Sequence, residues 1–116
     1  YAQYAVAKAE AMIEAARLAV RAAMVDIWAT VVAGGEATVE QCARSRRACA
    51  HAAESSLEAV QLCHRAAGGA ALFAESPFEA AVRDVSAMCG HLVFQRAMME
   101  DAGRVAFGRA PVLPNF

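Results

Sequence analysis

The sequence lacks several features that identify common classes of protein. No apolar run approaches the roughly 20 residues of a membrane span, and the N-terminus lacks the layout of a secretory signal. The net charge is −1, and neither sign forms a long run. This argues against a nucleic-acid partner, which needs a basic stripe. Strand-like alternation and internal repeats are also absent, so the chain is predicted to be all-α.

The four cysteines show no sign of a disulfide framework. They form no Cys-x-x-Cys pair, and no secretory signal supports oxidation. Cys42 and Cys49 lie about 10 Å apart along one predicted helix, which is too far for a disulfide. We therefore expect reduced thiols in a cytoplasmic protein.

Two functional alternatives for these cysteines are a metal site and a nucleophilic catalytic thiol. Helical geometry counts against a metal site, because Cys89 and His91 would point about 200° apart on one helix. No ligand pair has the i,i+3 or i,i+4 spacing of a helical zinc site. Nothing places a base beside any thiol, as nucleophilic catalysis requires. We predict packing roles for all four cysteines, and no metal.

Composition points to a helical piece of a larger assembly. Of the 116 residues, 59% are hydrophobic but only 7% are aromatic. That apolar fraction is high for a small domain, in which much surface faces water. The chain also begins within a helical pattern and without methionine. We expect a fragment of a longer protein, with apolar surface covered by something outside this sequence.

Three long antiparallel helices are predicted, over residues 1 to about 33, about 36 or 38 to 67, and 76 to about 108. Gly34-Gly35 and Gly68-Gly69 end the first two helices. Thr38 and Gln41 suit a capping box, and Ser76-Pro77 suits the start of the third helix. Three helices with this much apolar surface predict a bundle completed by a fourth helix, either missing here or supplied by another subunit.

The first predicted helix carries an apolar stripe and an opposite charged face. The stripe follows a three-four spacing and comprises Tyr4, Lys8, Ala11, Ala15, Ala19, Ala22 and Asp26. Glu10, Glu14, Arg17 and Arg21 form the charged face, on which Glu14 and Arg17 are spaced to form an ion pair. Trp28 continues that face, and two interpretations remain open: it is covered by a partner, or it is a half-covered rim residue.

The chemistry-bearing residues gather between Gly68 and His91. Gly68-Gly69 is either a helix cap or a place where backbone approaches a phosphate. Asp84, Met88 and His91 form one row on the third predicted helix. His91 is either a structural histidine or a donor and proton shuttle to a bound ring.

The spacing of this region resembles the C-terminal helical domain of acyl-CoA dehydrogenases. The matching residues are Gly68-Gly69, Pro77, Phe78-Glu79 and Arg83-Asp84, with Ala43-Arg44 before them and Gly103-Arg104 to Gly108 near the end. Within that superfamily, Arg83-Asp84 followed by His91 looks closest to flavin-dependent monooxygenases of the 4-hydroxyphenylacetate and steroid-phenol hydroxylase type. The resemblance covers most of the chain, and its specific part is about 40 residues long.

The resemblance implies a flavin cofactor, FAD or FMN, bound in the full-length protein. It would place His91 near the flavin ring and substrate, with Asp84 orienting His91 or pairing with Arg83. Gly68 and Gly69 would lie at the flavin phosphate or adenosine end, and Arg83 would be a further cofactor-binding residue. A homo-oligomer, a dimer or tetramer formed through helix faces, and a flavin reductase are the implied partners.

Two departures from the dehydrogenase pattern bear on the activity. Arg65 stands where dehydrogenases often have a glutamine, and Leu92 stands where many carry the carboxylate that removes the substrate α-proton. A leucine cannot abstract a proton, which favours a monooxygenase acting on a phenol or similar aromatic. The alternatives are an acyl-CoA dehydrogenase with its base outside this fragment, and a non-enzymatic helical oligomerisation module. In either enzyme the fragment alone is expected to be inactive.

Overall fold

A computed structural model describes residues 1–73, 75–114 and 116, and every regular element in this part of the chain is helical. Ala74, between the second and third predicted helices, and Asn115, beyond the end of the third, lie outside the described residues. The elements are α1 (Ala2–Val32), α2 (Val39–Ala67), η1 (Gly68–Leu72), α3 (Pro77–Cys89), η2 (Leu92–Phe94) and α4 (Arg96–Ala106). The predicted all-α class is confirmed.

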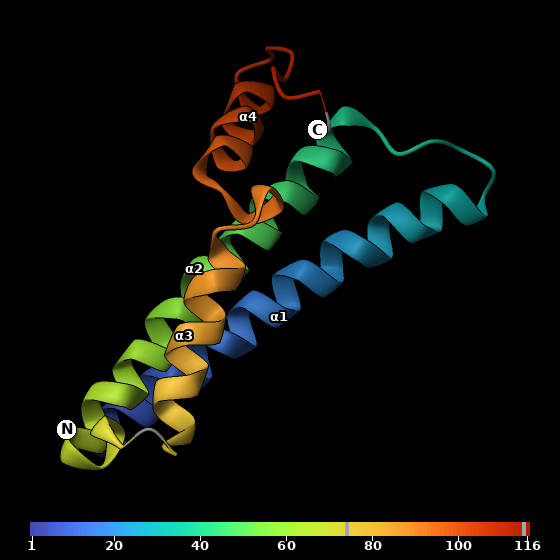
Figure 1. Ribbon diagram of the computed structural model, residues 1–116. Coiled ribbons are helices and arrows are strands. Elements are labelled where there is room, and N and C mark those ends of the chain that lie inside the picture. Colours follow the sequence, from blue (N-terminus) through green and yellow to red (C-terminus); the bar gives the residue numbers. More distant parts are fainter. Residues whose placement is uncertain (74, 115) are drawn as a thin grey trace.

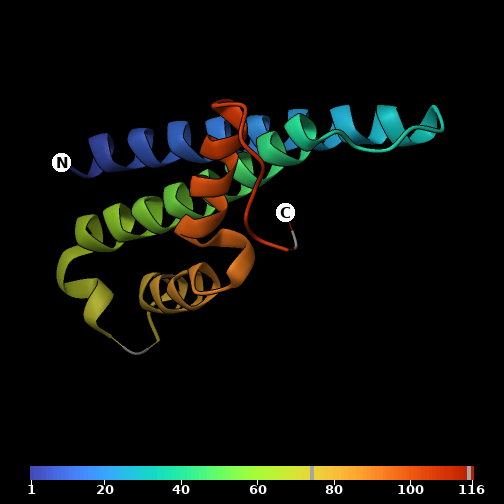
Figure 2. The same ribbon diagram turned by 90° about the horizontal axis from the view of Figure 1, so that it is seen from above.

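Helix α2 is the centre of the structure, which measures 52 × 25 × 24 Å. Helices α1 and α3 lie on opposite sides of α2 and both run antiparallel to it (Figures 1 and 2). Helix α4 contacts the N-terminal part of α2, beyond the end of α3 (Figure 1). None of the described helices is long and apolar enough to cross a bilayer.

The predicted start of α2 is confirmed in detail. The Thr38 hydroxyl accepts a hydrogen bond from the Gln41 N–H at 3.1 Å, and the Gln41 side chain accepts one from the Thr38 N–H at 3.0 Å. Gln41 also donates to the Thr30 hydroxyl at 2.7 Å. One side chain therefore caps α2 and ties its first turn to the last turn of α1.

The predicted third helix is divided, which corrects its extent. The Gly90 N–H caps α3 by donating to the Ala87 carbonyl at 3.2 Å, and the His91 N–H donates to the Met88 carbonyl at 3.0 Å. His91 itself is extended, with φ −69° and ψ 140°. The Gln95 side chain donates to the Gly90 carbonyl at 3.1 Å and closes the turn. The apolar spacing continues through this turn, so the periodicity alone gave a continuous helix. The predicted link after Gly69 likewise begins as the short helix η1.

The buried face of α1 also differs from the prediction. Its buried residues are Ala5, Ala9, Ala16 and Ala23, roughly a quarter of a turn from the predicted stripe. Most of that stripe is exposed, including Tyr4, Ala11 and Ala15. Alanine occurs on nearly every side of this helix, so the sequence contains two apolar faces, and α2 covers only one of them.

The C-terminal segment is held by one large buried side chain and one buried carboxylate. Met98 of α4 is 1% exposed and is the largest fully buried side chain among the described residues. Asp101 is 3% exposed and accepts hydrogen bonds from the N–H groups of Val112 and Leu113, at 2.9 and 2.6 Å. These bonds fold the non-helical tail back onto α4.

Candidate functional site

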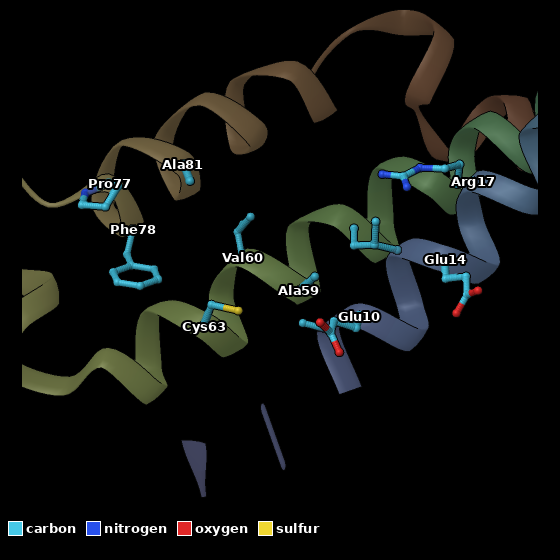
Figure 3. A pocket seen from close by; sticks show the side chains of 11 residues that line it. Glu10, Glu14, Arg17, Ala59, Val60, Cys63, Pro77, Phe78 and Ala81 are labelled. Carbon is cyan, nitrogen blue, oxygen red and sulfur yellow. The ribbon is translucent and has the colours of Figure 1, made fainter. Parts of the chain in front are cut away.

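A groove of about 760 Å³ lies between α1, α2 and α3. It lies where α1 and α3 flank α2, and all three helices contribute residues to its lining. Phe78 of α3 points toward the α2 side of the groove, where Val60 and Cys63 lie (Figure 3). Glu10 and Glu14 of α1 line the opposite rim. Arg17 lies on the same rim, so the groove has an apolar floor and an edge that carries charges of both signs.

Two smaller hollows continue the groove along α2. The first, of about 410 Å³, shares Ile13 and Arg17 with the large groove. The second, of about 200 Å³, shares Val20 with the first and ends at Met88 and Phe94. The apolar surface thus runs from the start of α3 to the turn that carries His91.

His91 stands at the end of that surface, in the turn between α3 and α4. Its Nδ1 accepts a hydrogen bond from the Val93 N–H at 3.3 Å, and its ring packs against Phe94 with centroids 6.0 Å apart. An Nδ1 that accepts belongs to the neutral tautomer with the proton on Nε2. His91 is exposed, so this arrangement presents an Nε2–H donor to whatever lies beside the turn.

Arg83 and Asp84 meet each other but not His91. The Arg83 Nε lies 3.8 Å from an Asp84 oxygen, and the Arg83 guanidinium lies 3.7 Å from a Glu79 oxygen. The predicted row from Asp84 to His91 is wrong, because α3 ends before His91. No hydrogen bond or ion pair among the described residues joins the two side chains. Two roles were predicted for Asp84, orienting His91 or pairing with Arg83. The structure shows the pairing with Arg83 and no contact with His91.

Gly68 and Gly69 precede α3 whereas His91 follows it, and this 13-residue helix is about 20 Å long. Gly68 ends α2 with φ +59°, a conformation that favours glycine. Both glycines are exposed, and a Cβ at either position would meet no other group. The predicted site residues therefore form two separate groups, one at each end of α3.

Sequence reasoning missed the residues that shape the His91 turn. Phe94 contacts the histidine ring, and Gln95 closes the turn onto Gly90. A glycine inside a helical pattern was the available signal, since such a residue often marks a C-cap. All four cysteines are free thiols, and the Cys89 thiol donates to the Ala53 carbonyl at 3.4 Å. The described residues contain no group of three metal-ligating side chains.

Comparisons with known proteins give matches that cover most or nearly all of the chain. Residues 1–96 match the family described as "Acyl-CoA dehydrogenase, C-terminal domain". A protein of Acinetobacter baumannii named indole-3-acetate monooxygenase is 34% identical over 109 residues, which is 94% of this chain and 28% of that protein. A Pseudomonas putida protein of the same name is 30% identical over 115 residues, 99% of this chain and 29% of its own length.

The chain thus spans less than a third of the length of these relatives. No solved structure gives a significant match.

Proposed function

Because the chain belongs to the family of acyl-CoA dehydrogenase C-terminal domains, we propose that it is the C-terminal helical domain of a longer flavoprotein monooxygenase. The observation that carries this proposal is the similarity, along 94% and 99% of the chain, to two relatives named indole-3-acetate monooxygenase. Their name points to an aromatic carboxylic acid as the substrate class.

The residues of this chain fit a flavin as part of the wall of its site. Gly68 and Gly69 offer exposed backbone that no side chain covers, and Arg65 adds an exposed cation three residues earlier. Arg83 is a further exposed cation, at the middle of α3. These groups suit the phosphates of FAD or FMN. The flavin, when bound and reduced, supplies two electrons to O₂, so that one oxygen enters the substrate and the other leaves as water.

His91 carries the proposed chemistry of this chain. Its Nε2–H can donate a hydrogen bond to an oxygen of the substrate or of the reacting dioxygen, and can pass a proton as charge develops there. The Val93 N–H fixes the tautomer by occupying Nδ1. Phe94 restrains the ring from one side. Asp84 pairs with Arg83 and so adjusts the charge presented by α3.

A His91 pair of variants in the full-length protein tests this role. His91→Asn keeps a side-chain acceptor for the Val93 N–H, as asparagine does in Asx turns, but removes the imidazole Nε2–H. We expect hydroxylation of indole-3-acetate, with a flavin reductase and NADH, to fall about 100-fold or more while flavin binding is retained. His51→Ala, on an exposed face of α2, is the matched control and should leave turnover unchanged.

Unchanged turnover in His91→Asn would remove His91 from the mechanism. Loss of flavin binding in the same variant would assign His91 to the cofactor site instead of the chemical step.

Acyl-CoA dehydrogenation is the second candidate, and the description of the family favours it. Leu92 cannot act as its base, so the carboxylate would come from outside this chain. Reduction of an electron acceptor by an acyl-CoA, with no reductase-dependent hydroxylation, would establish this alternative.

A further inference from the structure

The turn between α3 and α4 interrupts a helical pattern. The apolar spacing of the third predicted helix continues through residues 90–95, so a single helix over this stretch is the competing conformation. In the structure α3 ends at Cys89, and α4 leaves the turn in a different direction (Figure 2). The turn contains one short 3₁₀ helix, η2, which has no buried residue. Hydrogen bonds therefore have a large part in deciding between the two conformations.

The hydrogen bond made by the Gln95 side chain replaces one that a continuous helix would make. In an α-helix the Gly90 carbonyl would accept from the N–H of residue 94. In the structure the Phe94 N–H donates to the His91 carbonyl at 2.9 Å instead. The Gln95 Nε2 takes its place and donates to the Gly90 carbonyl at 3.1 Å. The Gln95 amide thus satisfies a carbonyl that the end of α3 leaves without a helical partner.

The same exchange of partners determines what binds to the His91 ring. In a continuous helix the Val93 N–H would donate to the Cys89 carbonyl, four residues earlier. In the turn it donates to the His91 Nδ1 at 3.3 Å. An imidazole whose Nδ1 is an acceptor carries its proton on Nε2. The arrangement that fixes the Nε2–H as the donor therefore requires that α3 stop at this turn.

We propose that Gln95 is a positioning residue for His91. By ending α3 at the Gly90 carbonyl, its side chain keeps the Val93 N–H on the His91 Nδ1. This inference rests on the function proposed above, in which His91 donates from Nε2. The backbone of Gln95 has a separate role, since its carbonyl accepts from the Met98 N–H at 3.0 Å and begins α4. Every residue supplies such a carbonyl, whereas only a side-chain donor can take the place of the amide.

Two substitutions in the full-length protein separate this role from a cap on α4. Gln95→Glu keeps the size of the side chain but removes the donor, and its negative charge at the N-terminus of α4 favours that helix. Gln95→Lys keeps a donor with the length to reach the Gly90 carbonyl, and its positive charge disfavours the same helix end. A positioning role predicts lost turnover in the first variant and retained turnover in the second. A role confined to stabilising α4 predicts the reverse.

Hydroxylation should fall about tenfold in Gln95→Glu, because a hydrogen bond of ordinary strength shifts the balance between two conformations by about that factor. KM and flavin binding should be retained, since Gln95 acts through the turn and not on substrate or flavin. Gln95→Glu should cause no further loss in a protein that already carries His91→Asn, because both changes remove the same interaction. Gln61→Glu, the same change at an exposed position of α2, is the matched control and should leave turnover unchanged.

Carbethoxylation by diethyl pyrocarbonate gives a readout that does not depend on activity. The reagent attacks the imidazole nitrogen that carries no proton. In the turn this nitrogen of His91 is occupied by the Val93 N–H. His91 should therefore react slowly in the unsubstituted protein and severalfold faster in Gln95→Glu. Peptide mass spectrometry measures each histidine separately, and His64, in the last turn of α2, is the internal reference.

Three results would overturn the proposal: full turnover in Gln95→Glu, equal losses in the Glu and Lys variants, or an undiminished effect of Gln95→Glu in the His91→Asn background. Unchanged turnover in His91→Asn alone would instead contradict the function proposed above. The carbethoxylation rate would then decide the inference by itself. An unchanged rate at His91 in Gln95→Glu would refute it, and a faster rate would show that Gln95 fixes the ring.

Discussion

The α1–α2 pair and the C-terminal segment, which is α4 with the tail that follows it, are held in place by different means. The α1–α2 contact is made of small side chains, and every buried residue of α1 is an alanine. The C-terminal segment depends on Met98 and on the buried carboxylate of Asp101. The first contact is distributed over two long helices, whereas the second is concentrated in one short helix.

The difference follows from how much surface each side chain removes from water. An alanine buries little area, so a stable contact requires many of them along a long helix. A buried methionine contributes as much as several alanines and fills irregular space. We therefore expect the C-terminal segment to be sensitive to loss of a single large side chain, and the α1–α2 contact to be sensitive to added bulk.

Removing the anchor of α4 should have the largest effect. Met98→Ala leaves a cavity beneath a helix with few other buried residues, and should lower the free energy of unfolding by about 3 kcal/mol. Urea denaturation at one protein concentration measures the change. Met88→Ala, at a methionine that is 44% exposed, is the control and should cost much less. Equal costs for the two would show that α4 does not rely on Met98.

Adding bulk to the α1–α2 contact should have the next largest effect. Ala16→Leu places a leucine at a position that is 4% exposed, within the α1–α2 contact. It should cost about 2 kcal/mol of stability. The neighbouring Ala15→Leu lies on the exposed face and should change stability by no more than about 0.5 kcal/mol. If Ala15→Leu instead costs more stability than Ala16→Leu, then the face predicted from the sequence is the one that packs on α2.

The two regions also differ in how well the sequence predicts them. The ends of α1 and α2 and the start of α3 were predicted correctly, because glycine pairs, Thr38 with Gln41, and Ser76-Pro77 act through local backbone chemistry. The buried face of α1 was predicted wrongly. Alanine occurs on several sides of this helix, so the hydrophobic periodicity does not distinguish the buried side from the others. Choosing between two apolar faces requires knowing where α2 lies, which is tertiary information.

The candidate site shows the same division between local and tertiary information. The pairing of Arg83 with Asp84 was one of the two roles that the resemblance implied for Asp84, and both residues belong to the same helix. The environment of His91 could not be predicted from the sequence, because it depends on Gly90 ending α3 and on the Gln95 side chain closing the turn. Glycine in a helical pattern permits either continuation or a stop. The contacts made by Gln95 decided between them.

Removing the charge of Asp101, which holds the C-terminal tail, should give the smallest of the three effects. Asp101→Asn keeps an oxygen for the Val112 and Leu113 N–H groups but removes its charge and the 3.8 Å ion pair with Arg104. We expect a loss of about 1 kcal/mol, since hydrogen bonds to a charged acceptor are stronger than those to a neutral one. Amide hydrogen exchange at Val112 and Leu113 should accelerate more than exchange within α4.

Glu100→Gln is the matched control for Asp101→Asn, because Glu100 is exposed and pairs only with Arg96 among the described residues. It should leave exchange in the tail unchanged. If Asp101→Asn instead accelerates exchange throughout α4, then the carboxylate supports the helix itself, and the tail is a part of the structure that α4 requires. The C-terminal segment would then resemble the α1–α2 pair, with its stability distributed over several contacts.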